Sequence, residues 1–277
     1  MKMKKGILCF AVSWILAVAL HGQVSDTMRM DSLARTDFSM VQQEYTTDNV
    51  TKAQGDSAYM REDYTTAIQI YEKLLEQGEA AEVYYNLGNS YYKTNDIARS
   101  ILNYERALML QPGNSDIRAN LDIARSKTID KVTPIPEVFF VTWIRSLINC
   151  LNSDAWAKLG IACFLLLLAS MGLFFFGKSV ILKKVGFIGA LSMLFLCVVS
   201  NVFAGQQKKE RLSQDKAIVL VPSITVRSTP SESGTSLFVL HEGHKVEIKD
   251  NSMHEWKEII LEDGKVGWVP ASVIEII

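Results

Sequence analysis

The sequence predicts a multidomain membrane protein that combines an all-α helical-repeat module, a two-helix transmembrane hairpin and a small all-β barrel. Three observations predict this fold class: an internal repeat with a period of 33 residues, two long apolar runs between residues 155 and 204, and a C-terminal segment of short alternating runs separated by turn residues. The hydrophobic pattern therefore changes along the chain from helical spacing to continuous apolarity and then to a period of two. A chain of 277 residues is long enough for several such small domains.

The charge of the chain argues against a nucleic-acid partner. The formal net charge is −1, and both polar segments are mildly acidic: residues 48–130 hold 13 acidic and 9 basic residues, and residues 216–277 hold 9 and 6. Domains that bind nucleic acid usually carry a basic stripe instead.

The four cysteines lie in or beside apolar stretches, at Cys9, Cys150, Cys163 and Cys197. Because neither polar segment contains a cysteine, we expect no disulfide framework and no cysteine-based metal site.

Residues 1–22 have the pattern of a secretory signal peptide. Three lysines stand among the first five residues, an uncharged apolar run covers residues 6–20, and small residues follow. Cleavage is possible after Ala17-x-Ala19 or near Gly22, and we favour Gly22, which leaves residues 23–47 as a linker. The alternative is an uncleaved anchor helix, but the run is shorter than the roughly 20 residues that a bilayer requires.

Two later runs are long and apolar enough to cross a membrane, at residues 155–176 and 185–204. The first holds one charge, Lys158, near its start, where a long side chain can reach the membrane surface. Two buried core helices are the alternative. A tandem pair joined by a short lysine-bearing connection favours membrane spans.

The connection 177–184 contains three lysines, which predicts a cytoplasmic loop by the positive-inside rule. Basic residues also flank the other ends of the two spans, so charge alone does not decide the orientation: Arg145, Lys208, Lys209 and Arg211. An exported N-terminus decides it. We therefore expect a protein of the inner (cytoplasmic) membrane with both soluble domains facing the periplasm.

Residues 138–151 precede the first span and predict an amphipathic helix at the membrane interface. Phe139, Phe140 and Trp143 cluster at its start, and aromatic side chains favour the interfacial layer of a bilayer.

The segment 48–111 repeats itself. Residues of the first copy recur 33 positions later with the same or similar size: Gly55 and Gly88, Ala67 and Ser100, Tyr71 and Tyr104. A small residue is expected where two helices cross, a large one beside the crossing, and Pro112 ends the last helix of the second copy.

The second copy, residues 81–114, resembles the tetratricopeptide family. The matching positions are Tyr84, Leu87, Gly88, Tyr91, Ser100, Tyr104, Ala107 and Pro112. The first copy departs from the family pattern, with Thr51, Gln54 and Glu79 at positions where an aromatic residue, a leucine and a proline are usual. A helix over 115–127 with Ile117, Leu121 and Ala124 on one face then fits a cap, so that the module covers 48–130.

The resemblance implies an α-helical module that binds a protein partner on its concave face. The first helix of each repeat lines that face, and its outward positions give the candidate partner-binding residues: Lys52, Asp56, Tyr59, Glu82, Tyr85, Asn89, Tyr92 and Lys93. Tyrosine and asparagine at such positions suit a peptide groove.

Residues 216–277 predict a small β-barrel. Six short alternating runs read as strands: 218–221, 224–227, 237–240, 245–248, 256–260 and 266–270. Turn residues separate these runs, and Asp263-Gly264 predicts a tight turn with a positive φ.

This segment resembles the bacterial SH3-type domains. The resemblance rests on Val226-Arg227-Ser228-x-Pro230, on Leu240-His241-Glu242-Gly243, and on Gly267-Trp268-Val269 near the end. Such domains bind cell-wall peptides or other proteins. Trp256 and Trp268 are candidates either for a binding cleft or for the core.

The sequence offers no catalytic constellation. His241 and His244 lie across a turn and lack the helical H-x-x-x-H spacing of a zinc site, because Lys245 stands at the needed position. The sequence contains no glycine-rich phosphate loop, and no serine–histidine–aspartate or cysteine–histidine set can be assembled. We therefore expect no metal, no cofactor and no enzymatic activity.

The order of modules resembles the BatE-like family of the Bacteroides aerotolerance operon. This resemblance covers nearly the whole chain apart from the linker, and its specificity lies in the order of the modules. It implies partners among von Willebrand factor A-type membrane proteins and a MoxR-type ATPase system. It also implies a role in an envelope complex linked to aerotolerance or stress tolerance.

Two functions of different classes follow from these observations. The first is a non-catalytic membrane-anchored scaffold or adaptor in an envelope complex. The alternative is a cell-wall sensor whose SH3-like domain binds peptidoglycan peptides.

Overall fold

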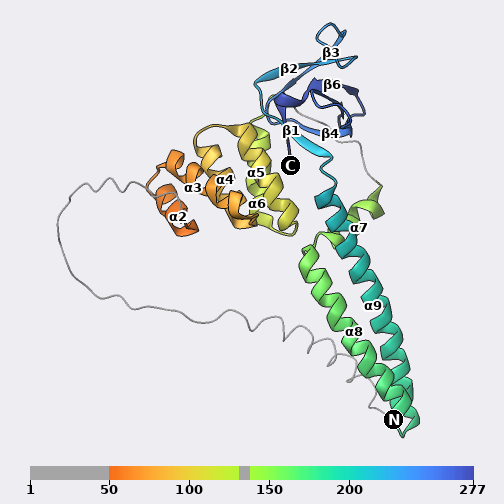
Figure 1. Ribbon diagram of the computed structural model, residues 1–277. Helices are drawn as coiled ribbons and strands as arrows, with labels where there is room; N and C mark the ends of the chain where they lie inside the picture. Colours follow the sequence, from red (N-terminus) through yellow and green to blue (C-terminus); the bar gives the residue numbers. More distant parts are fainter. Residues whose placement is uncertain (1–49, 131–137) are drawn as a thin grey trace, which may run out of the picture. The chain divides into compact units, whose positions relative to one another are not determined.

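The computed structural model describes residues 50–130 and 138–277. The expected signal peptide, residues 1–22, and the linker, residues 23–47, lie outside the described residues. The chain divides into two units, Met1–Thr46 and Thr47–Ile277, and the following description concerns the second (Figure 1).

Five helices form the helical module at the start of this unit (Figure 1). They are α2 (Lys52–Met60), α3 (Tyr64–Gln77), α4 (Ala81–Lys93), α5 (Ile97–Leu110) and α6 (Ser115–Ser126). Neighbouring helices in this order pack against one another. The predicted helical repeat is confirmed.

The two helix pairs of the module use the same local signals 33 residues apart. Asp63 and Asp96 cap α3 and α5, each by accepting a hydrogen bond from the backbone N–H three residues later. The residue before each cap adopts a left-handed conformation, with φ of 63° at Glu62 and 64° at Asn95. Each pair is thus closed by the same turn.

The cores of the two pairs also repeat. A Cβ on Gly55 would lie 2.5 Å from the ring of Tyr71, and a Cβ on Gly88 would lie 2.7 Å from the ring of Tyr104. Both tyrosine side chains are buried. The glycines are therefore required for the aromatic ring of the second helix to reach the first.

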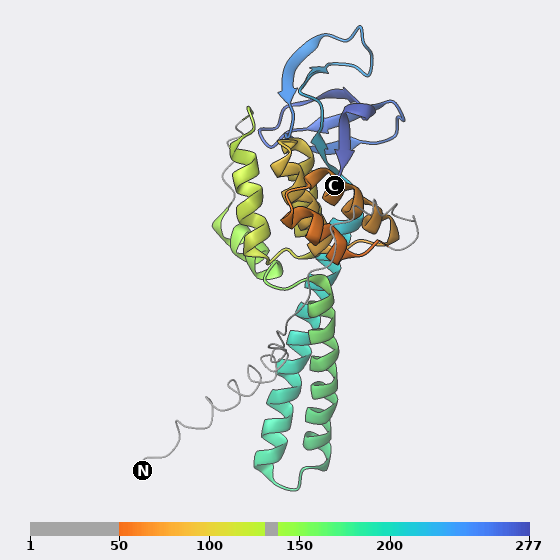
Figure 2. The same cartoon turned by 90° about the vertical axis from the view of Figure 1, so that its left-hand side faces the viewer.

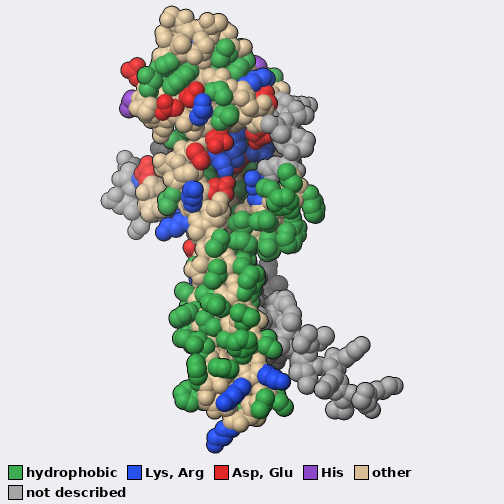
Figure 3. Space-filling view, turned by 90° about the vertical axis from the view of Figure 1, so that its right-hand side faces the viewer, with side chains coloured by type: hydrophobic (Ala, Val, Ile, Leu, Met, Phe, Trp, Pro, Cys, Tyr) green, Lys and Arg blue, Asp and Glu red, His purple; other side chains and the backbone are tan. Residues whose placement is uncertain are grey.

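Two long apolar helices, α8 (Ser153–Phe176) and α9 (Val180–Leu212), run side by side after a shorter helix, α7 (Phe139–Ile148) (Figure 2). Only 11% of the most apolar window of α8 and 6% of that of α9 are buried within the described chain. A core helix of a soluble protein would be mostly buried. The hydrophobic surface of the hairpin, seen in Figure 3, is that of a membrane anchor.

The hairpin differs from its predicted bounds. The connection is shorter than the predicted 177–184, because α9 already begins at Val180 and includes Lys183 and Lys184 in its first turns. At its other end α9 continues to Leu212, past the predicted end at 204. Lysine, arginine, glutamine and glutamate are good helix formers, so the loss of apolar character does not end the helix.

The C-terminal residues form the β domain, a single antiparallel sheet of seven strands (Figure 1). The strands are β1 (Lys216–Val219), β2 (Ser223–Arg227), β3 (Ser236–His241), β4 (Lys245–Asp250), β5 (Trp256–Ile260), β6 (Val266–Pro270) and β7 (Ile274–Ile276). Their order in the sheet is β3-β2-β6-β5-β4-β1-β7. The sheet curls around one core, because Leu240 of its edge strand packs in the same hydrophobic cluster as Val219 and Val269.

The β domain agrees with the predicted strands and adds one. Gly264 has a φ of +85°, as expected for the turn after Asp263. The additional strand β7 follows a short 3-10 turn, η1 (Ala271–Val273), and pairs with β1.

The β domain packs directly on the helical module. Ile218 of β1 is fully buried in the hydrophobic cluster that contains Ile101 and Leu102 of α5. Glu105 of α5, whose side chain is 9% exposed, forms an ion pair with Lys245 of β4 at 2.7 Å. The two domains therefore share a hydrophobic contact and a buried ion pair.

Candidate functional site

The inner face of the helical module, formed by α2, α4 and α6, carries a repeated set of hydrogen bonds. Asp56 accepts from the Tyr71 hydroxyl at 2.7 Å and from the Asn86 side chain at 2.9 Å. Asn89, 33 residues after Asp56, accepts from the Tyr104 hydroxyl at 2.6 Å and from the Asn120 side chain at 3.0 Å. We call these two sets the polar ladder: Asp56, Tyr71, Asn86, Asn89, Tyr104 and Asn120.

The first step of the polar ladder is anionic at neutral pH. Partial burial raises the pKa of the Asp56 carboxyl, but hydrogen bonds from Lys52 and Tyr71, the charge of Lys52 and a hydrogen bond from Asn86 outweigh burial and hold the pKa below its ordinary value. Lys52 contacts Asp56 at 2.9 Å and Glu82 at 3.8 Å. The second step has a neutral amide at the equivalent position. The inner face therefore changes in charge from one repeat to the next.

Three half-buried tyrosines gather on the same face. The rings of Tyr85 and Tyr104 lie 6.0 Å apart, and Tyr59 is close enough that the Tyr85 hydroxyl contributes, after burial and Tyr64, to raising its pKa. The ammonium of Lys127 lies 4.1 Å from the centre of the Tyr92 ring. Aromatic rings and amide groups at one surface provide both apolar contact and hydrogen-bond partners, which suits a peptide.

The eight predicted partner-binding residues all lie on helices α2 and α4 of this face. Glu82 and Lys93 are exposed, while the other six are half-buried: Lys52, Asp56, Tyr59, Tyr85, Asn89 and Tyr92. Tyr85 and Tyr92 pack against the core of the module. These two tyrosines therefore contribute to the stability of the module as well as to its surface.

Sequence reasoning missed the contribution of α6 to this face. Asn120 donates to the Tyr85 hydroxyl at 2.9 Å as well as to Asn89, so α6 occupies the place of a third first helix rather than acting only as a cap. The spacing contained a signal, because Asn120 follows Asn86 by 34 residues and Asn89 follows Asp56 by 33. Together these positions repeat one polar pair along the face.

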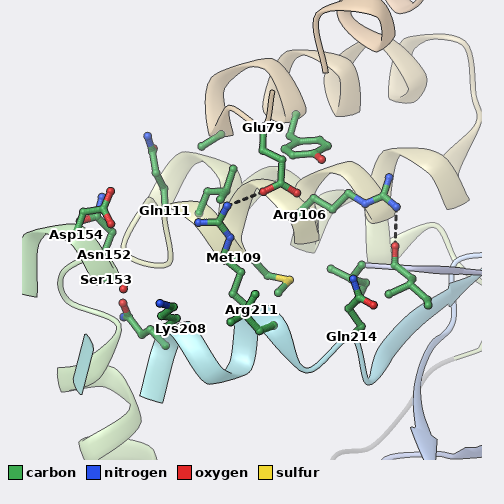
Figure 4. Close-up of a pocket in the computed structure, with 17 residues that line it drawn as sticks. Glu79, Arg106, Met109, Gln111, Asn152, Ser153, Asp154, Lys208, Arg211 and Gln214 are labelled. Carbon is green, nitrogen blue, oxygen red and sulfur yellow. Dashed lines mark hydrogen bonds and ion pairs between the residues drawn. The ribbon is translucent and has the colours of Figure 1, made fainter. Parts of the chain in front are cut away.

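A cavity of about 1020 Å³ opens between the helical module, the ends of α8 and α9, and β7 (Figure 4). Arg211 donates to Glu79 at 2.6 Å. Arg106 donates to Glu275 at 2.9 Å and to the Ile276 carbonyl at 2.6 Å. These arginines hold the walls of the cavity together, so their contacts are structural.

In the β domain, Trp256 and Trp268 are half-buried, and the hydrophobic core is made by other side chains. Leu237 and Val239 are 48% exposed on the edge strand β3. An edge strand with exposed apolar side chains can pair with an extended peptide. The β domain therefore has its own candidate surface.

The histidine pair of the β domain contacts the end of the helical module. His241 Nδ1 lies 2.8 Å from one carboxylate oxygen of Asp130, and His244 Nδ1 lies 3.6 Å from the other. Burial raises the pKa of the Asp130 carboxyl, but hydrogen bonds from the backbone and side chain of His241 and the charges of both histidines outweigh burial and hold the pKa below its ordinary value. The pair thus contributes to the contact between the two domains.

Comparison with known proteins supports both binding modules. Residues 81–114 match the family model of the tetratricopeptide repeat, and residues 222–275 match that of the bacterial SH3 domain. No curated protein matches the chain. The described chain therefore joins two segments that resemble non-catalytic binding modules, a tetratricopeptide repeat and a bacterial SH3 domain, through two apolar helices long enough to cross a membrane.

Proposed function

We propose that the chain is a membrane-anchored adaptor that binds an envelope protein on the inner face of its helical module. The observation that carries this proposal is the polar ladder with its half-buried tyrosines, which presents hydrogen-bonding groups and aromatic rings together on α2, α4 and α6. In this proposal the anchor lies in the inner membrane, and both binding modules face the periplasm.

The order of the modules supports a specific setting for this adaptor. It is the order of the BatE-like family, so we propose a role in an envelope complex linked to aerotolerance or stress tolerance. The proposed partners are von Willebrand factor A-type membrane proteins associated with a MoxR-type ATPase system. They would contact the chain through the eight residues of α2 and α4 and through Asn120.

The test exchanges two exposed charges on the inner face, Glu82→Lys together with Lys93→Glu. The exchange keeps the net charge and leaves the packed tyrosines in place, so the module should remain folded. Placing each charge against its former counterpart in a partner should cost at least a roughly tenfold loss of affinity. The measurement is the yield of crosslinked envelope proteins that co-purify with the tagged full-length chain.

The matched control exchanges two exposed charges elsewhere on the module, Arg61→Glu together with Glu76→Lys. It should retain partners at the wild-type yield. Equal yields from the inner-face variant and the wild-type chain would rule out this face as the partner site.

A second candidate function is recognition of the cell wall by the β domain. The match to the bacterial SH3 domain favours it, together with the exposed apolar side chains of Leu237 and Val239. Sedimentation of the full-length protein with purified sacculi separates the two functions. Binding that survives the inner-face exchange but is lost in Leu237→Ser with Val239→Ser would assign wall recognition to β3.

A further inference from the structure

A second cavity, of about 510 Å³, lies among α5, α6, α7, α9 and the β domain, and we call it the basic cavity. Six basic side chains and three acidic ones line it, which gives a net charge of +3 in a chain whose total is −1. The basic ones are Arg118, Arg125, Arg145, Arg211, Lys216 and Lys245. Figure 3 shows Lys and Arg side chains gathered above the hydrophobic surface of the hairpin.

The ion pairs of the basic cavity leave positive charge uncompensated. Glu105 is a single buried carboxylate that pairs with two cations, Arg125 and Lys245. Burial raises the pKa of Glu105, but these two cations outweigh burial and hold the pKa below its ordinary value. Arg118 donates at 2.7 Å to the carbonyl oxygen of Pro112, which is a neutral acceptor. An anion in the cavity would therefore meet guanidinium groups that already have fixed positions.

The basic cavity lies at the height of lipid headgroups. Gln207 of α9 lines it, three residues after the apolar run ends at Ala204, and Arg211 follows one turn later. At a rise of about 1.5 Å per residue, these residues stand roughly 5–10 Å beyond the hydrocarbon. The headgroup layer on each side of a bilayer is about that thick.

One wall of the basic cavity is a helix suited to the membrane surface. Arg145 and Asn149 line the cavity at the end of α7, while Phe139, Phe140 and Trp143 of the same helix are more than half exposed. The end of α7 is tied to the hairpin, because Gln207 donates to the Ile148 carbonyl at 2.7 Å and Trp156 donates to the same oxygen at 2.8 Å. The cavity and the apolar side chains of α7 therefore face the same layer of the bilayer.

We propose that the basic cavity binds the phosphate-bearing headgroup of an anionic phospholipid of the phosphatidylglycerol class. The two acyl chains would remain beside the exposed surface of α7 and the hairpin, and the phosphodiester would lie near Arg118 and the Arg125–Lys245 pair. This lipid would join the helical module to the membrane. The inference is independent of the partner proposed for the inner face.

The test measures lipid uptake by the delipidated full-length protein in detergent, by native mass spectrometry. The probes are dioleoyl-phosphatidylglycerol, dioleoyl-phosphatidylcholine and inorganic phosphate. Wild-type protein should retain phosphatidylglycerol roughly tenfold better than phosphatidylcholine, because only the first leaves its negative charge uncompensated. Added salt should reduce this preference.

Three variants assign the preference to the basic cavity. Arg118→Gln should reduce it about tenfold, since a hydrogen bond to a charged group is lost, and Arg118→Lys should retain most of it. Arg118 is exposed, so neither variant should unfold the module. Lys178→Gln, an exposed lysine at the other end of the hairpin, is the matched control and should behave like the wild-type protein.

The proposal is overturned if the two lipids are retained equally, or if Arg118→Gln and Lys178→Gln behave alike. It is also overturned if inorganic phosphate displaces phosphatidylglycerol at equal concentration, because the site would then serve free phosphate.

Discussion

Gly88 shows how one missing side chain allows two helices to pack. A Cβ at this position would lie 2.7 Å from the Tyr104 ring and 3.3 Å from the Ser100 carbonyl. The Tyr104 hydroxyl in turn donates to Asn89, so any shift of the ring would also disturb the polar ladder. Packing and surface chemistry thus depend on the same residue.

We predict that Gly88→Val destabilises the helical module, because overpacking in a close-packed core typically costs about 1–3 kcal/mol. The measurement is thermal unfolding of the full-length protein in detergent, followed by circular dichroism. Gly78→Ala is the control, because a Cβ at Gly78 meets no atom within 4 Å. An unchanged melting temperature in Gly88→Val would contradict the packing described here.

The sequence predicted the residues of the inner face on α2 and α4 because helical spacing determines which side chains share a face. It did not predict the role of Asn120. The repeat pattern weakens after Pro112, so the third helix showed only the apolar face of a cap. Hydrogen bonds from Asn120 to Tyr85 and Asn89 depend on how α6 packs against α4, which no local pattern encodes.

At the scale of elements, α5 is the helix on which the β domain docks. Its buried Glu105 pairs with Arg125 of α6 and Lys245 of β4, and its Ile101 lies in the same cluster as Ile218 of β1. The pairs join residues up to 140 positions apart in the chain. A residue such as Glu105 looks in the sequence like any charged position on a helix surface, so this docking could not be predicted.

We predict that Glu105→Gln destabilises the full-length protein by about 3–5 kcal/mol at pH 7, because two cations lose their buried carboxylate. The pKa of Glu105 in the folded protein is lower than its ordinary value of 4.5. Its stabilisation is therefore complete above pH 4.5 and is lost as the pH falls from there through the folded-state pKa.

The measurement is the difference in melting temperature between wild-type protein and Glu105→Gln as a function of pH. The difference should shrink below pH 4.5, and Glu76→Gln, an exposed position on α3, should show little difference at any pH. A difference that grows as the pH falls would contradict the assignment.

The strands and apolar helices were predicted more completely than their ends. The alternating runs identified six of the strands, but β7 is three residues long and depends on pairing with β1. The end of α9 at Leu212 was not predicted because apolarity marks where a membrane span ends, whereas a helix continues as long as its backbone hydrogen bonds do.

At the scale of the whole molecule, the hairpin places both binding modules on one side of the membrane. Residue 152 before α8 and residue 213 after α9 stand at the same end of the hairpin, since α8 and α9 pack side by side and connect through only three residues, 177–179. The proposed export of the N-terminus makes that side the periplasm.

We predict that single cysteines introduced at Ser115 and Ser252, in a background whose four native cysteines are replaced by serine, react with a membrane-impermeant thiol reagent in cells with an opened outer barrier. A cysteine in place of Lys178 should react only after the inner membrane is permeabilised. The measurement is labelling detected by a gel shift. Protection of Ser115→Cys and Ser252→Cys together with labelling of Lys178→Cys would reverse the proposed orientation.

The buried Glu105–Lys245 pair also has a consequence for how ligands are held. Because it joins α5 to β4 beside a shared hydrophobic cluster, the two binding modules cannot rotate freely like beads on a flexible linker. A ligand complex that contacts both modules would pay the entropic cost of alignment only once. The second contact would then form at an effective concentration of about millimolar, and the combined avidity could exceed either single affinity by roughly 10²–10⁴.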